Sequence, residues 1–266
     1  MSSSAAFFDL DRTLMAGSSG LHFGRAAFRS GMVSRRQLAG WAVDNLRFRL
    51  RGSTDAATER VLTQVKELLT GVPARDLERL APDVLAGVLP RIYPQMLDEV
   101  RAHQDAGRIT AIVSAAGSGL VEPLAHVLGM DAGLGTRYAI DEAGMMTGDL
   151  DGSFMYGAGK AEAIREFAAE RDIDLQESWA YSDSASDLPM LRAVGNPVVV
   201  NPDTELTRIA AADGWRVMRF EKLGRRLAIA GATVVAAAVG GGGTLLARKR
   251  PATPTLRARA PIPWRR

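Results

Sequence analysis

The chain has 266 residues, of which 47% are hydrophobic and 24% are charged, a balance that is ordinary for a globular protein with room for a core domain and a smaller second one. The lack of cysteine excludes disulfides and thiolate metal sites, and three scattered histidines argue against a histidine-based zinc centre. The formal net charge of +3 is uneven, because residues 222–266 carry ten Lys or Arg and no acidic residue. The preceding 221 residues hold 23 basic and 30 acidic side chains, a net charge of −7.

The apolar run Ala5–Phe8 predicts a buried strand. Asp9 follows it directly, so we expect its carboxylate at the carboxyl edge of a sheet, presented to solvent. Strand alternation places Asp11 on the same side. A carboxylate nucleophile and a second carboxylate as general acid and base suit hydrolysis of a phosphate ester, with Thr13 among the substrate-binding residues. The alternative is that Asp-x-Asp is only a polar turn.

Residues 15–93 show helical periodicity and no strand signal, which predicts an all-helical cap domain. Three helices are expected in it, at residues 37–51, 54–69 and 74–89. A helical lid over a sheet edge excludes water and selects the leaving group, and its hinges are expected near residues 15–17 and 89–94. Three arginines of the cap form either a solvated helix face or a contact for an acidic substrate group: Arg47, Arg49 and Arg51.

A second strand is predicted over residues 108–113, with Ser114 at its end. The Ser114 hydroxyl and the backbone amide of Ala115 are suited to hold phosphate oxygens. Alternatively, Ser114 or Ser118 only caps the helix that runs to about Leu128.

Lys160 opens an apolar-periodic helix, so its ammonium is expected near the positive end of the helix dipole. That position is unfavourable for a cation unless an anion such as phosphate lies between them. The simpler interpretation is an exposed surface lysine.

A third strand is predicted over residues 178–181, and Asp183 and Asp187 follow it. Their spacing lets both carboxylates face one Mg²⁺, which prefers a few oxygen ligands completed by water and substrate oxygens. The alternative for Asp187 is to cap the next helix.

Strands and helices alternate as far as Val217, with a hairpin around residues 141–144. This alternation predicts an α/β fold with a doubly wound, Rossmann-like parallel sheet. The core domain is expected to comprise residues 1–14 and 94–220, with the cap inserted at residues 15–93.

In the order, spacing and residue types of these four segments, the chain resembles the haloacid dehalogenase superfamily of phosphohydrolases, closest to the phosphoserine-phosphatase-like branch with a helical cap. The resemblance implies that Asp9 is the nucleophile and a Mg²⁺ ligand, and that Asp11 is the general acid and base and reaches the metal through its carbonyl. It further implies that Ser114 and Lys160 bind the phosphoryl group. Asp183 would be a metal ligand, and Asp187 would support the metal site through water.

Three positions depart from the phosphoserine phosphatase pattern. Ser18 stands where that group carries a glutamate that binds the substrate ammonium, Ala115-Ala116 replaces a glycine pair, and Ser186 replaces an asparagine. We therefore expect an intact hydrolytic machinery with a substrate other than L-phosphoserine.

Residues 221–266 are expected to form a basic tail. Its segment 227–247 has 21 uncharged residues, enough to cross a bilayer core, which needs roughly 20, although its glycines disfavour a helix. It is either a transmembrane anchor, with flanking arginines at lipid headgroups, or a flexible basic linker for acidic partners. The acidic balance of the rest argues against nucleic-acid binding.

Together these features predict a Mg²⁺-dependent phosphomonoester hydrolase that acts through an aspartyl phosphate on a small phosphorylated metabolite. No secretory signal is recognised at the N-terminus, so a cytoplasmic catalytic domain is expected. The alternative is a membrane-associated regulatory or binding protein with a retained phosphatase fold. The presence of both Asp9 and Asp11 favours catalysis.

Overall fold

The computed structural model describes residues 3–34, 36, 40 and 55–220. The chain divides into two compact units, Met1–Phe220 and Glu221–Arg266, and every described residue lies in the first. The apolar segment 227–247, the three cap arginines and nearly all of the predicted helix 37–51 lie outside the described residues. No helix within the described part is long and apolar enough to cross a membrane.

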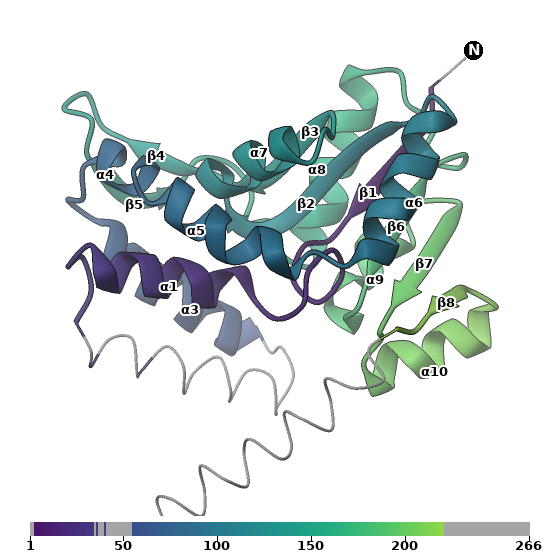
Figure 1. Cartoon of the computed structure of the whole chain (residues 1–266). Helices are drawn as coiled ribbons and strands as arrows, with labels where there is room; N and C mark the ends of the chain where they lie inside the picture. The colour runs from purple at the N-terminus through teal and green to yellow at the C-terminus, as the bar shows by residue number, and fades with distance from the viewer. Residues whose placement is uncertain (1–2, 35, 37–39, 41–54, 221–266) are drawn as a thin grey trace, which may run out of the picture. The chain divides into compact units, whose positions relative to one another are not determined.

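Six strands form one parallel sheet at the centre of this unit (Figure 1). Their order is β3-β2-β1-β6-β7-β8, and every neighbouring pair is parallel. The bounds are β1 Ala5–Phe8, β2 Ile109–Gly117, β3 Ala132–Thr136, β6 Trp179–Ser182, β7 Asn196–Val200 and β8 Arg216–Met218. The chain starts in the middle, runs outward to β3, and then returns beside β1 to run outward the other way. The predicted doubly wound sheet is confirmed, and its strand order reverses between β1 and β6, where such sheets bind ligands.

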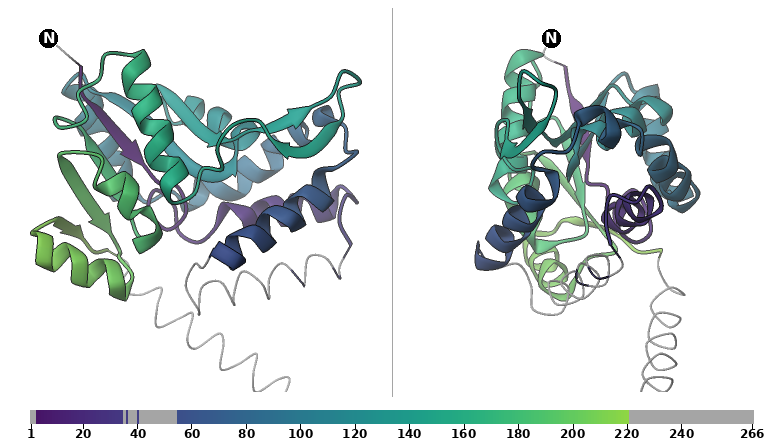
Figure 2. Two further views of the ribbon diagram at one scale, coloured as in Figure 1. Left: turned by 180° about the vertical axis from the view of Figure 1, so that it is seen from behind. Right: turned by 90° about the vertical axis from the view of Figure 1, so that its left-hand side faces the viewer.

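Helices cover both faces of the sheet (Figures 1 and 2). One face carries α6 (Pro94–Asp105) and α7 (Ser118–Val127), whose hydrophobic cluster extends to α1 (Ser19–Arg29) and α5 (Ala81–Val88). The other carries α8 (Ala158–Glu170), α9 (Leu188–Leu191) and α10 (Thr204–Asp213). Because side chains alternate along β1, Phe8 packs into the first cluster and Phe7 into the second. Complete burial of each ring stabilises the fold by roughly 1.5–3 kcal/mol.

Every element described between residues 15 and 93 is a helix. Besides α1 and α5 they are α3 Asp55–Leu69, α4 Ala74–Glu78 and the short 3₁₀ helix η1 Leu89–Arg91. The predicted single helix over 74–89 is wrong, because the chain breaks it between α4 and α5. Pro82 lies in the first turn of α5, where a residue without an N–H is accommodated at a helix start.

The two segments that connect residues 15–93 to the rest lie side by side. Met15 forms an antiparallel bridge with Ile92, the Ala16 N–H donates to the Arg91 carbonyl at 2.8 Å, and the Tyr93 N–H donates to the Leu14 carbonyl at 2.9 Å. Both predicted hinge regions are therefore hydrogen-bonded to each other. The division of Met1–Phe220 into a core and a cap stays a prediction.

A hairpin of β4 (Tyr138–Ile140) and β5 (Met146–Leu150) encloses the predicted turn at 141–144. It packs against α3, where Lys66 Nζ lies 2.6 Å from Asp149 Oδ1 and the Thr70 hydroxyl donates to the Thr147 carbonyl at 3.1 Å. Gly148 has a φ of +79°, and a Cβ there would lie 2.6 Å from the Thr70 hydroxyl oxygen. Glycine therefore permits the close approach of the hairpin to the helix.

Candidate active site

Asp9 is the first residue after the central strand β1. Its backbone N–H donates to the Tyr181 carbonyl of β6 at 3.0 Å, which fixes the residue where the strand order reverses. Its side chain was expected to face solvent, but Asp9 is only 6% exposed. That expectation is wrong because a basic side chain from α8 lies directly against the carboxylate.

This basic side chain is Lys160, in the first turn of α8. It is 3% exposed, and its Nζ donates to Asp9 Oδ1 at 2.6 Å and to Asp187 Oδ2 at 2.8 Å. The hydroxyl of Ser182 donates to the same Asp187 oxygen at 2.7 Å. The interpretation of Lys160 as a surface lysine is wrong. Glycine at 159 lets this turn approach the preceding loop, because a Cβ there would collide with a carbonyl oxygen.

Burial and charge act in opposite directions on this cluster. Burial raises the pKa of Asp9 to about 6, with Lys160 opposing the rise and Asp187 adding to it. Burial by itself lowers the pKa of Lys160, but the carboxylates of Asp187 and Asp9 outweigh it, so the pKa lies above its ordinary value. Lys160 is therefore a permanently charged ammonium inside the protein.

Asp183 follows β6 and is 4% exposed. Its Oδ2 lies 3.1 Å from a guanidinium nitrogen of Arg12, yet that oxygen accepts no hydrogen bond, because the pair is close without being aligned. Burial raises the pKa of Asp183 well above its ordinary value; Arg12 opposes the rise, and Asp9 and Asp187 add to it. Asp183 thus has a buried oxygen that lies close to one cation, the Arg12 guanidinium, without a hydrogen bond to it.

Arg12 was missed by the sequence analysis. Its φ of +64° lies in the left-handed region, which non-glycine residues rarely adopt. The available signal was its place between Asp11 and Thr13, inside the segment that carries the first two carboxylates.

Asp11 is held apart from the lysine cluster. Its Oδ2 accepts a hydrogen bond from the Ser18 hydroxyl at 2.9 Å, and its Oδ1 accepts one from the Ser19 backbone N–H at 2.8 Å. Both donors stand at the start of α1. The charge of Asp11 contributes, as the smallest of several causes, to the raised pKa of Asp9.

Of the residues assigned to phosphate binding, Lys160 belongs to the cluster, whereas Ser114 and Ala115 make hydrogen bonds elsewhere. Ser114 is 3% exposed and lies inside β2, because the strand continues to Gly117 and does not end at Val113 as predicted. Its hydroxyl accepts from the Ala116 N–H at 3.2 Å, and the Ala115 carbonyl accepts from the Thr136 hydroxyl at 2.9 Å.

Thr13 is fully buried, and its hydroxyl oxygen has no hydrogen-bond partner. The capping interpretations also fail, since Gly117 is the N-cap of α7 and no side chain caps that helix. Asp187 occupies the N-cap position of α9 but makes no capping bond, because its carboxylate is bound to Lys160 and Ser182.

The structure thus brings Asp9, Lys160 and Asp187 into direct contact. Asp183 and Asp11 interact with this cluster through their charges. Among the described residues, no three histidine, aspartate or glutamate side chains are close enough to hold a metal ion by themselves. The buried carboxylate oxygens of Asp9 and Asp183 are of the type that hard cations prefer as ligands.

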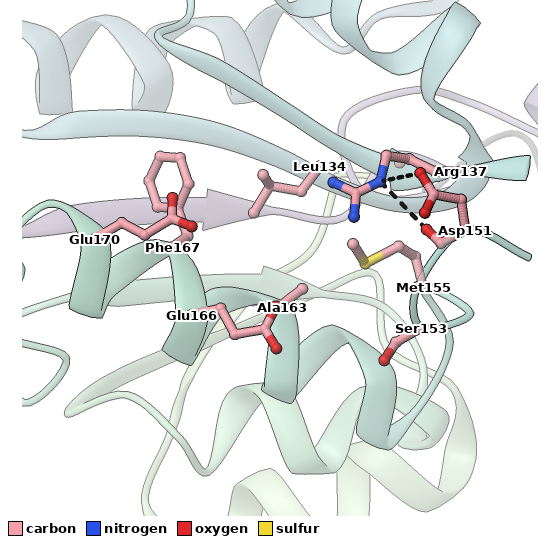
Figure 3. A pocket seen from close by; sticks show the side chains of 11 residues that line it. Leu134, Arg137, Asp151, Ser153, Met155, Ala163, Glu166, Phe167 and Glu170 are labelled. Carbon is pink, nitrogen blue, oxygen red and sulfur yellow. Dashed lines mark hydrogen bonds and ion pairs between the residues drawn. The ribbon is translucent and has the colours of Figure 1, made fainter. Parts of the chain in front are cut away.

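A surface pocket lies between β3, residues 151–155 and α8 (Figure 3). Figure 3 shows Arg137 directed at Asp151, with an ion-pair distance of 3.5 Å, and Glu166 and Glu170 project from α8. None of the predicted site residues lines this pocket. It is separate from the lysine cluster.

Comparison with known proteins places this arrangement in a family. The model for haloacid dehalogenase-like hydrolases matches residues 6–192. The chain is 38% identical over 219 residues to the inhibition of morphological differentiation protein of Streptomyces azureus, covering 82% of this chain and 79% of that protein. It is 33% identical over 247 residues to a Mycobacterium tuberculosis protein named phosphoserine phosphatase SerB1, covering 91% and 79%.

A crystal structure of a Bordetella pertussis protein of unknown function is similar, with a TM-score of 0.70 and 28% identity over 82% of this chain and 99% of that one. The family match spans β1, β2, α8 and β6, which are the elements that carry the cluster. The chain therefore belongs to the haloacid dehalogenase-like hydrolases.

Proposed function

We propose that this protein is a Mg²⁺-dependent phosphomonoester hydrolase that acts through an aspartyl phosphate on a small phosphorylated metabolite. The observation that carries the proposal is Lys160, buried with its ammonium between Asp9 and Asp187 at the point where the strand order reverses. A fixed cation beside a carboxylate nucleophile is suited to a substrate whose charge must be balanced during reaction.

In the first step, a carboxylate oxygen of Asp9 forms a bond to phosphorus while the bond from phosphorus to the ester oxygen breaks. Lys160 contacts Oδ1, so we assign the attack to Oδ2. Asp11 gives its proton to the departing alcohol. In the second step Asp11 takes a proton from water, whose oxygen attacks the phosphorus and releases Asp9 and inorganic phosphate. Lys160, Ser114 and the Ala115 amide are assigned to the phosphate oxygens, with Thr13 supporting them.

The donor atoms suit Mg²⁺. Asp183 has a buried oxygen without a hydrogen bond, and burial beside Asp9 and Asp187 raises its pKa, so a divalent cation would relieve an unfavourable concentration of negative charge. We assign Asp9, the Asp11 carbonyl and Asp183 as ligands, with Asp187 acting through water. When bound, Mg²⁺ supplies positive charge to the phosphate oxygens and the nucleophile.

We further propose that residues 15–93 are a helical cap over a core of residues 1–14 and 94–220. The adjacent, hydrogen-bonded connections support this division. A cap over the carboxyl edge of the sheet would exclude water from the reaction. No feature of the described residues favours the alternative of a non-catalytic binding protein.

The test is phosphate release from p-nitrophenyl phosphate by the purified full chain. We expect activity with Mg²⁺, loss of activity with a chelator, and loss in Asp9→Asn, which cannot form the aspartyl phosphate. Asp11→Asn should lower the rate by about 10²–10⁴-fold, the usual contribution of general acid–base catalysis. The matched control is Asp98→Asn, a surface residue paired with Arg101 on α6, which should leave the rate unchanged. Wild-type activity in Asp9→Asn would refute the mechanism.

A further inference from the structure

We propose, on the basis of the phosphatase function above, that Ser18 is a positioning residue whose hydroxyl holds Asp11 in place for proton transfer. The Ser18 hydroxyl donates to Asp11 Oδ2 at 2.9 Å, and the adjacent Ser19 N–H donates to Oδ1 at 2.8 Å. Two bonds to the two oxygens of one carboxylate fix both its position and the plane of the group.

The contact between Ser18 and Asp11 takes the place of the capping hydrogen bond that a serine in this conformation usually makes with its own helix. Ser18 is the N-cap of α1, with φ −133° and ψ 129°, a conformation in which serine usually accepts a hydrogen bond from its own helix. No such bond is made. Instead the hydroxyl binds Asp11, and the Asp11 carboxylate satisfies the N–H of Ser19 in the first turn. The helix is capped by the carboxylate that we assign to proton transfer.

A hydroxyl is suited to this position because Asp11 must alternate between two protonation states. A serine hydroxyl donates to a carboxylate and, after rotation, accepts from a carboxylic acid. The Ser19 backbone N–H only donates, and in either protonation state Asp11 keeps an oxygen that can accept from it. Ser18 is the contact that can also accept, so it can hold the Asp11 oxygen that carries the proton.

The contact also links the acid to the helical segment. Ser18 and Ser19 begin α1, directly after Gly17, whose φ of +91° turns the chain out of the connection from β1. Any displacement of α1 relative to β1 would carry the two donors away from Asp11. The position of the first helix and the position of the acid are thereby coupled.

The test compares two kinds of leaving group. p-Nitrophenolate departs without a proton, whereas an alkoxide needs one, so only the second ester depends strongly on a positioned acid. We would measure kcat/KM, which covers the steps up to loss of the leaving group, for p-nitrophenyl phosphate and for the alkyl phosphate that the wild-type enzyme hydrolyses best. Ser18→Ala should lower kcat/KM about tenfold to hundredfold for the alkyl ester, the usual effect of losing a hydrogen bond to a charged group, and less than about threefold for the aryl ester.

Three further variants control the result. Ser18→Thr retains a hydroxyl and should restore alkyl ester hydrolysis. Ser18→Gly lacks the hydroxyl but is well tolerated at a helix N-cap, so it should match Ser18→Ala and serves if the alanine variant folds poorly. Ser30→Ala removes a hydroxyl at the other end of α1, where it donates to the Ala27 carbonyl at 2.9 Å, and should leave both values unchanged.

An equal loss on both esters, no loss on either, or failure of Ser18→Thr to restore activity would overturn the positioning role. Inactivity of the wild-type enzyme on every ester would instead refute the phosphatase function, and the positioning role with it.

Discussion

The side chain at position 18 also bears on substrate choice. Ser18 has a hydroxyl and no carboxylate to offer a substrate ammonium, and that hydroxyl is hydrogen-bonded to Asp11. A lost hydrogen bond between charged groups costs roughly 1.5–3 kcal/mol, about one to two decades in kcat/KM. We therefore expect L-phosphoserine to be hydrolysed no better than 3-phosphooxypropionate, its analogue without the amino group. The measurement is kcat/KM for the two esters on wild-type enzyme. A value for phosphoserine more than about tenfold higher would contradict the expectation.

At the residue scale, the sequence predicted the place of a residue along the chain better than its contacts with distant residues. The placement of Asp9 after a buried strand is confirmed, since that depends only on local hydrophobicity. The contact of Lys160 with both Asp9 and Asp187 joins residues 151 and 27 positions apart, and no local pattern reports such distances. Arg12 was missed for another reason. Its place between Asp11 and Thr13 was visible in the sequence, but its left-handed backbone conformation is rare for arginine, so backbone propensity did not predict it.

At the scale of elements, a chain of hydrogen bonds ties α6 to β6 and β8, buried at its centre between His103 and Tyr181 and exposed at Arg216. Arg108 contacts His103 Nδ1 at 3.3 Å, His103 Nε2 lies 2.8 Å from the Tyr181 hydroxyl, and that hydroxyl donates to Glu99 at 2.9 Å. Arg216 of β8 completes the chain with two bonds to Glu99. Because the tyrosine proton goes to Glu99, the His103 Nε2–H must donate to the tyrosine oxygen. Arg108 can only donate, so His103 Nδ1 accepts from it and carries no proton, and His103 is therefore held in its neutral form.

This network predicts a pH dependence of stability. Burial first, and then the charge of Arg108, lower the pKa of His103 from 6.5 to about 4. Between these values the unfolded chain binds a proton that the folded chain does not, so the free energy of unfolding should fall as the pH falls from 6.5 to 4. The full shift corresponds to at most about 3 kcal/mol. Urea unfolding at pH 7 and at pH 4.5 measures the change.

The contribution of His103 is isolated by comparison with variants, because buried carboxylates titrate in the same range. His103→Gln should lose less stability between the two pH values than the wild type does. His126→Gln, a change at an exposed position on α7, should behave like the wild type. Identical pH dependence in wild type and His103→Gln would contradict the prediction.

The bounds of helices and strands were predicted where they depend on local signals and missed where they depend on contacts between distant segments. The helix at 54–69 and the hairpin turn at 141–144 were predicted because each depends on a local repeat or turn signal, and both are present as α3 and β4–β5. The continuation of β2 to Gly117 was not predicted, since it depends on pairing with Thr136 across a register shift. The docking of β5 on α3 likewise depends on contacts between distant segments.

At the scale of the whole molecule, the parallel sheet and its helical layers were predicted from alternation, which constrains topology strongly. The site lies entirely within Met1–Phe220, so a chain ending at Phe220 should fold and retain full activity. Phosphate release by this shortened chain and by the full chain is the measurement. Loss of activity in the shortened chain would show that residues 221–266 contribute to the catalytic unit.

The same pair of chains tests the two interpretations of segment 227–247, a transmembrane anchor and a flexible basic linker. If that segment inserts in a bilayer, the full chain should remain in the membrane pellet after a high-salt wash, and the shortened chain should not. Release of the full chain by salt alone would indicate attachment through its arginines.

The pairing of the two segments that connect residues 15–93 to the rest bears on how that region could be exchanged for another. Because the Ala16 N–H bonds to the Arg91 carbonyl, residues 16 and 91 stand next to each other. In the proposed division into core and cap, the cap is therefore an insertion with adjacent ends. Such an insertion can be replaced by another of different length at little cost in loop-closure entropy, since the gap to be closed stays the same. In this proposed arrangement, the strand before Asp9 and the helix that carries Lys160 would stay constant while the inserted segment is exchanged, so substrate range would diverge without a change in the proposed catalytic residues.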